Sequence, residues 1–140
     1  MTAPTAADVD IGGNSASGYI EQFADNGRWC YADAADVRNT FDTNGFDESQ
    51  VHLVKGDVLE TLKKPVPEAI SILRLDTDWY ESTKLELEVL YPRLVTGGVL
   101  IVDDYGHWEG SRQAVDEFFA KTPSLLLHRT SYAVRTAIKL

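Results

Sequence analysis

The stretch from residue 72 to residue 105 constrains the fold more than any other. Two apolar runs in it, 72–75 and 99–102, are each followed by carboxylates, and one amphipathic segment lies between them. This order predicts a strand, a crossover helix and a second strand parallel to the first, joined in the right-handed sense. Ligands of an open parallel sheet bind beside the carboxyl ends of its strands. We therefore expect the functional site at the acids.

Several boundaries follow from local signals. The first strand is expected over 70–75, and a T-x-x-E capping box at Thr83 and Glu86 starts the crossover helix near Thr83. Gly97-Gly98 is expected to turn the chain into the second strand, and Ser111 to cap the helix that follows. The runs 125–128 and 133–140 predict a closing antiparallel hairpin.

Two further elements are expected upstream. Asp33 is a good N-cap for a helix that ends at Asn44-Gly45. Residues 51–54 form a short run of strand-favouring side chains that Gly56-Asp57 ends.

Composition excludes several classes of protein. The 140 residues suit one domain, and 22 acids against 13 Lys and Arg give a net charge of −9. That charge argues against a nucleic-acid or anionic-membrane surface. Cys30 is the only cysteine, which excludes a disulfide framework and a thiolate metal cluster. No apolar run approaches the roughly 20 residues of a membrane span, and the first ten residues lack the regions of a signal peptide. We expect a cytoplasmic protein.

The acids after the two strands are Asp76 and Asp78, then Asp103 and Asp104. A single Asp after a strand is most often an N-cap or turn residue. Four acids at the ends of two neighbouring strands would repel one another unless a cation lay between them, and a hard cation such as Mg²⁺ takes oxygen ligands. Asp103 and Asp104 point to opposite faces within a regular strand, so they converge only where the strand ends. Asp78 is equally compatible with a ligand, a helix cap and a surface residue.

A glycine-rich segment, 10–18, has the look of a nucleotide-binding loop. The residues before it, Thr5-Ala6-Ala7-Asp8, lack the β-branched run of a buried parallel strand. We therefore favour a polar loop without a cofactor. The alternative is a degenerate first motif at 10–18, with 29–33 as the second strand.

The central stretch resembles the macrocin O-methyltransferase family. The resemblance rests on LDTDWYEST at 75–83, LYPRL at 90–94 with Gly97-Gly98, and IVDDY at 101–105. These enzymes use S-adenosylmethionine and Mg²⁺ to methylate sugar hydroxyls of natural products. Thr77 departs from the family, which often has glycine between the two acids.

The resemblance implies a Rossmann-like methyltransferase sheet, mostly parallel with a C-terminal antiparallel hairpin. It also implies roles for matching positions. Asp76, Asp103 and Asp104 would hold the metal, and Asp76 would also be the general base. Asp57 and Val58 would lie near the S-adenosylmethionine, and Tyr105 and His107 would lie near the acceptor.

The same resemblance implies an N-terminally truncated member. Residues 1–45 align with a cap-like or mobile segment that follows the family's first two strands, so 46–140 would be the core of a single, partial domain. The strand at 70–75 would then have an open edge, which predicts a homodimer or a strand-exchanged assembly.

Three functions follow as hypotheses. The first is S-adenosylmethionine- and Mg²⁺-dependent O-methyl transfer to a hydroxyl of a sugar or natural product, with weak or absent catalysis by this chain alone. The second is a non-catalytic remnant that acts as a metal-binding or interaction module. The third, a phosphate-handling hydrolase, is disfavoured because no strand ends in an aspartyl nucleophile with its Ser/Thr and Lys partners.

Overall fold

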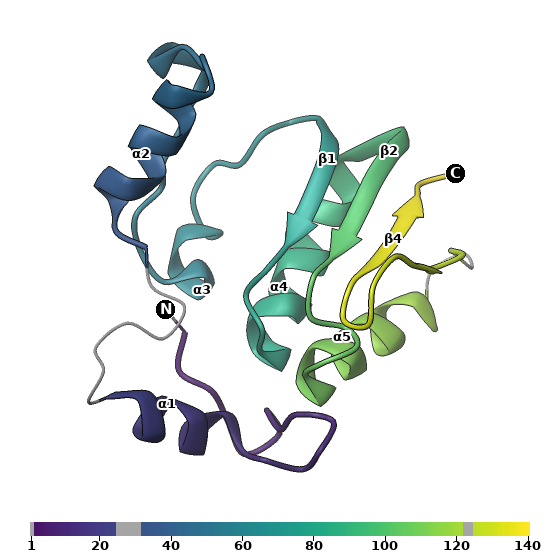
Figure 1. Cartoon of the computed structure of the whole chain (residues 1–140). Helices are drawn as coiled ribbons and strands as arrows, with labels where there is room; N and C mark the ends of the chain where they lie inside the picture. The colour runs from purple at the N-terminus through teal and green to yellow at the C-terminus, as the bar shows by residue number, and fades with distance from the viewer. Residues whose placement is uncertain (1, 25–31, 122–124) are drawn as a thin grey trace.

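A four-stranded sheet with its main helices on one face forms the centre of the computed structural model, which describes residues 2–24, 32–121 and 125–140 (Figure 1). The strands lie in the order β1-β2-β4-β3. Their bounds are β1 Ile70–Leu75, β2 Leu94–Val102, β3 His128–Arg129 and β4 Arg135–Ile138. β1 and β2 are parallel, as the sequence predicts.

The C-terminal hairpin is confirmed, because β3 and β4 are antiparallel. β4 also pairs antiparallel with β2. The expectation of a mostly parallel sheet is therefore wrong for the described residues, where one of the three strand pairings is parallel. The physical reason is that the hairpin folds back directly beside β2. The absence of the family's first two strands stays a prediction.

The core lies between the sheet and helices α4 Tyr80–Leu90 and α5 Glu109–Phe119. Side chains alternate across a strand, so every second residue of β1, β2 and β4 faces these helices. The buried set from the strands is Leu73, Leu75, Leu94, Leu100, Val102 and Ala137. Leu87 of α4, Tyr91 and Val115 of α5 complete the packing.

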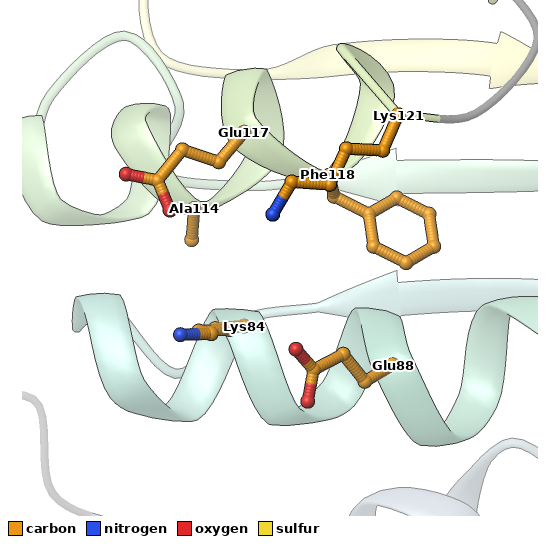
Figure 2. A pocket seen from close by; sticks show the side chains of 6 residues that line it. All are labelled: Lys84, Glu88, Ala114, Glu117, Phe118 and Lys121. Carbon is orange, nitrogen blue, oxygen red and sulfur yellow. The ribbon is translucent and has the colours of Figure 1, made fainter.

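A groove of about 240 Å³ separates the outer sides of α4 and α5 (Figure 2). Its lining carries Lys84 and Glu88 from α4, and Glu117 and Lys121 from the end of the α5 region. Positive and negative side chains are thus balanced there, so the groove favours neither sign of charged ligand.

Three expected boundaries are wrong. α4 begins at Tyr80, so Thr83 and Glu86 are buried within the helix and form no capping box. α5 begins at Glu109, so Ser111 lies inside it. Gly97-Gly98 lies within β2, where Gly97 has φ +81°. The glycines let the strand deform, and the register between β1 and β2 shifts there, so β2 starts earlier than expected.

Residues 51–54 form no strand. They follow the 3₁₀ turn Glu48–Gln50 and precede the short helix α3 Val58–Thr61. Residues that favour strands form one only beside a pairing partner, and no described residue pairs with this run.

The helix after Asp33 is confirmed as α2, Ala34–Thr43. The Asp33 carboxylate accepts hydrogen bonds from the N–H groups of Ala35 and Asp36, and Asn44 ends the helix. None of the α2 residues is buried. Residues 29–31 of the alternative second strand, 29–33, lie outside the described residues.

The N-terminal segment lies across the carboxyl ends of β1 and β2. It leads into helix α1, Ala16–Ala24. Asp10 forms a β-bridge with Trp108, and the indole Nε1 of Trp79 donates to the Thr2 carbonyl at 3.0 Å. Ala16, Trp79 and Trp108 form a second buried cluster. No helix in the described ranges is long and apolar enough to cross a membrane.

Candidate metal site

Two acid-bearing turns leave the sheet side by side. β1 ends at Leu75 and β2 at Val102. The backbone N–H of Asp103 donates to the carbonyl of Leu75 at 3.0 Å, so the pairing continues one residue past β2. The residues that follow β1 and those that follow β2 therefore begin at the same edge of the sheet, as the sequence predicts.

Three carboxylates converge at this edge. Asp76, Asp78 and Asp104 each have an oxygen within 4.8 Å of the others'. Asp78 has φ +67°, a left-handed conformation that Asp tolerates better than most residues. This conformation reverses the chain after Asp76. Both acids of the first turn thereby join the acid of the second.

The cluster is short of positive charge. Burial, followed by the negative charge of Asp78, raises the pKa of Asp104 to about 8. Burial also raises the pKa of Asp78. The Oδ2 atom of Asp104 is buried and has no hydrogen-bond partner among the described residues. A divalent cation would supply both the missing charge and a partner for this oxygen, so the residues present fit a hard metal ion.

Asp103, the fourth acid, lies outside the cluster and pairs with Arg74. The Nη2 atom of Arg74 lies 2.9 Å from Oδ2 of Asp76 and 3.0 Å from Oδ1 of Asp103. Burial raises the pKa of Asp76 even though the Arg74 charge opposes that shift. Of the three expected ligands, the structure brings Asp76 and Asp104 together. The third, Asp103, is paired with Arg74. Asp78 takes the third place in the cluster.

The expected cofactor residues lie next to the acids. Val58 lines a cavity of about 220 Å³ together with Gly56, Asp76 and Asp78. Asp57 caps α3, and its Oδ1 accepts the Leu59 N–H at 2.9 Å and the Thr2 hydroxyl at 2.8 Å. The Thr2 hydrogen bond and the Leu59 N–H hold the pKa of Asp57 below its usual value. One cavity thus joins the start of α3 to the acid cluster.

The expected acceptor residues have different surroundings. The Tyr105 hydroxyl donates to Asp116 at 2.8 Å, and the guanidinium carbons of Arg112 and Arg135 lie 5.5 and 4.9 Å from its ring centroid. His107 contacts the Tyr132 hydroxyl through Nδ1 and packs edge-on against Trp108. Tyr105 therefore faces α5, and His107 lies beside the hairpin loop.

Sequence reasoning missed two groups, the buried Glu86 beside the acids and the exposed Tyr132 beside His107. Glu86 accepts the Thr77 hydroxyl at 2.9 Å, and burial raises its pKa to about 7. It was interpreted as a cap because its spacing from Thr83 matches a capping box. Tyr132 carries no local signal, since only the fold brings it to His107.

The glycine-rich segment closes on itself. Oδ1 of Asp10 accepts the N–H groups of Gly12 and Asn14, each at 2.8 Å, and Oδ2 accepts the Tyr19 hydroxyl at 2.9 Å. The Asn14 side chain is the main cause of an Asp10 pKa of about 2. Two backbone amides of the loop are thus already bound by Asp10, and its role as a loop without a cofactor stays a prediction.

The family model for macrocin-O-methyltransferase (TylF) matches residues 24–123. The chain belongs to this family. It is 38% identical over 86 residues to a demethyldecarbamoylnovobiocin O-methyltransferase of Streptomyces niveus, covering 61% of this chain and 33% of that protein. It is 36% identical over 84 residues to a mycinamicin III 3''-O-methyltransferase of Micromonospora griseorubida, covering 60% of this chain and 33% of that protein.

Among solved structures, the O-methyltransferase NovP superposes on this chain with a TM-score of 0.75 and 27% identity. The superposition covers 95% of this chain and 56% of NovP. The likeness to the fold of this O-methyltransferase thus extends over nearly all of the chain. The matches to the curated relatives span about a third of each relative's length.

Proposed function

We propose that this chain is the metal- and acceptor-binding part of an O-methyltransferase that uses S-adenosylmethionine and acts on a hydroxyl of a sugar or related natural product. The observation that carries the proposal is the convergence of Asp76, Asp78 and Asp104 at adjacent strand ends, in a chain of this family. Its relatives are named for O-methyl transfer to such molecules.

The chemistry requires a cation and a base. A sugar hydroxyl is too weak an acid to ionise at neutral pH. A divalent cation, when bound, would lower the pKa of that hydroxyl and fix its orientation. Asp76 is the proposed general base, because its side chain is about half exposed and lines the cavity beside α3.

The proposed metal ligands are Asp76 and Asp104, which belong both to the observed cluster and to the set that the resemblance implies. Asp78 supplies a third carboxylate in the observed geometry. Asp103 is the third ligand in the family-based set, and it becomes available when its ion pair with Arg74 breaks.

S-adenosylmethionine is proposed to bind at the cavity that Val58 lines, with Asp57 fixing the start of α3 beside it. Tyr105 and His107 are proposed to border the acceptor. The Tyr105 hydroxyl is already held by Asp116, which supports a role for its ring as a wall.

A second function is favoured by one observation. Arg74 already pairs with Asp76 and Asp103, so part of the negative charge at the site is neutralised by the protein. A non-catalytic metal-binding or interaction module of the same fold would show this feature. We also propose that the chain forms a homodimer or strand-exchanged assembly through the edge of β1 that pairs with no described residue.

Titration calorimetry tests the proposal. Mg²⁺, and then S-adenosylmethionine with and without Mg²⁺, are titrated into the wild type, Asp104→Asn and the exposed-acid control Asp42→Asn. We expect Mg²⁺ affinity to fall at least about tenfold in Asp104→Asn and to stay unchanged in the control. Mg²⁺ binding without any S-adenosylmethionine binding would support the non-catalytic module. Equal Mg²⁺ affinity in all three proteins would refute the metal site.

A further inference from the structure

Asp8 is a fully buried acid far upstream of the metal site, with an exposed fraction of 0%. Its Oδ1 accepts the backbone N–H of Tyr80 at 2.8 Å. Its Oδ2 accepts the backbone N–H of Thr5 at 2.7 Å and the Thr5 hydroxyl at 2.9 Å. Both oxygens are therefore engaged, and one of them reaches a residue 72 positions later in the chain.

The contact between Asp8 and Tyr80 lies at the start of α4, directly after the turn that carries Asp76 and Asp78. Tyr80 is the first residue of α4, and its N-cap residue, Trp79, makes no side-chain capping bond. Asp8 instead accepts the N–H of the first helical residue, one of the N–H groups at a helix start that have no partner within the helix. Fixing the Tyr80 N–H also fixes the end of the turn 76–79, where Asp78 adopts its left-handed conformation.

The same segment fixes the second acid-bearing turn. The N–H of Ile11 donates to the carbonyl of His107 at 3.0 Å, and the N–H of Glu109 donates to the carbonyl of Val9 at 2.9 Å. We call residues 8–11 the N-terminal clamp, because they hold the turn after β1 and the turn after β2.

Gly110 shows how closely the clamp fits. A β-carbon at this position would lie 2.2 Å from Oδ1 of Asp8 and 3.0 Å from the backbone nitrogen of Tyr80. Asp8 thus occupies the space between the first residues of α4 and α5. Any side chain at position 110 must displace the carboxylate or the start of α4.

We propose that Asp8 is a positioning residue for the metal site. It holds the Asp78 turn against the Asp104 turn, although the carboxylates they carry repel one another. The inference rests on the proposed function, since it presupposes that the cluster binds a cation. Asp8 does not belong to the cluster, but its negative charge adds to burial in raising the pKa of Asp78, so the test must separate its position from its charge.

The test separates position from charge. Gly110→Ala keeps the Asp8 charge and disturbs its position, whereas Asp8→Asn removes the charge and keeps one acceptor oxygen. Thr5→Ala is a milder variant that removes one hydrogen bond to Oδ2. Asp42→Asn is the control, because it removes an exposed carboxylate of α2 that lies outside the clamp.

Mg²⁺ affinity is measured by calorimetry, and the melting temperature is measured with EDTA and with Mg²⁺. We expect Gly110→Ala and Asp8→Asn to bind Mg²⁺ at least about tenfold more weakly, Thr5→Ala to lose less, and Asp42→Asn to stay within about twofold of wild type. A purely structural role would lower the melting temperature in EDTA and leave the Mg²⁺ affinity of the folded protein unchanged.

Wild-type Mg²⁺ affinity in folded Asp8→Asn, Gly110→Ala and Thr5→Ala would overturn the inference and leave the metal site standing. A wild type that binds no Mg²⁺ would refute the proposed metal site, and the positioning role with it.

Discussion

Arg74 places a positive charge where a cation site needs negative ones. Its guanidinium pairs with Asp76 and with Asp103, so it competes with a metal ion for both carboxylates. Arg74 and Asp76 lie two residues apart at the end of β1, and that spacing puts both on one face of the sheet. Strand periodicity was therefore a signal that could have identified this pair from the sequence.

Replacing Arg74 by Gln should strengthen Mg²⁺ binding by about three- to tenfold, because the metal no longer displaces a guanidinium. Calorimetry measures the change, and Arg38→Gln, which removes an exposed arginine on α2, is the control. Unchanged or weaker binding in Arg74→Gln would show that Arg74 does not compete for the ligands.

Glu86 should make metal-free stability depend on pH. Burial raises its pKa from 4.5 to about 7 in the folded protein. The folded state then binds the proton more tightly than the unfolded state. The resulting stabilisation is complete below pH 4.5 and is lost as the pH rises through about 7, to a limit of about 3 kcal/mol. Asp104 contributes in the same direction, since burial and Asp78 raise its pKa to about 8.

Urea unfolding in EDTA at pH 5 and pH 8 measures this dependence. Glu86→Gln should reduce the loss of unfolding free energy between the two pH values. Glu88→Gln, which changes an exposed acid of the same helix, should keep the wild-type loss. Identical pH profiles for wild type and Glu86→Gln would mean that Glu86 does not titrate in this range.

Residue roles were predictable where the signal was local. The order of apolar runs and acids predicted the edge at which Asp76 and Asp104 meet, because strand ends follow directly from the pattern. Asp8 could not be assigned, since its partner Tyr80 lies 72 positions away. The exclusion of Asp103 from the cluster likewise depends on its Arg74 contact, which spans two strands.

At the level of the elements, α2 is a helix with a complete N-terminal cap and no buried residue. Asp33 and Asp36 form a complete capping box, and Asp33 alone was the signal from which the start of the helix was predicted correctly. None of its residues is buried, so tertiary packing contributes little to its stability. Its persistence should depend on the cap.

Asp33→Ala should therefore unfold α2 locally, since loss of an N-cap costs about 1 kcal/mol. Hydrogen exchange should quicken over residues 34–43 while the global unfolding free energy stays nearly constant. Asp42→Ala, at an exposed position of the same helix, serves as the control. A global loss of stability in Asp33→Ala would mean that α2 packs more tightly than the structure shows.

Elements whose boundaries depend on distant partners were predicted less well. α4 starts at Tyr80 because Asp8 caps it from another part of the chain. β2 starts at Leu94 because Gly97 deforms within a paired strand. The run at 51–54 has strand-favouring side chains but no described pairing partner, so no strand forms there.

At the scale of the whole molecule, the two faces of the sheet differ. Ile72, Val99 and Ile138 lie in register across β1, β2 and β4, on the face away from α4 and α5. Ile72 is 67% exposed and Ile138 is 60% exposed. Among the described residues, β1 pairs only with β2, so its other edge is free. A free edge beside an apolar row favours pairing with another chain.

Light scattering coupled to gel filtration should therefore give a dimer for the wild type. Antiparallel pairing of two β1 edges centred on Ile72 would extend the apolar row through both copies. Ile72→Lys should give a monomer, because it places a charge in that row. Ile11→Lys, at an isoleucine that is 55% exposed outside the sheet, should remain dimeric. A monomeric wild type would contradict pairing through this edge.

The buried tryptophan pair has an optical consequence. Trp79 directly follows the Asp78 turn and Trp108 directly follows His107, and their ring centroids lie 5.0 Å apart at 68°. Two indoles this close couple their ultraviolet transitions, so near-ultraviolet circular dichroism reports their packing. With Trp29 replaced by Phe, the remaining signal would show, without any attached label, whether the two turns stay together as conditions change.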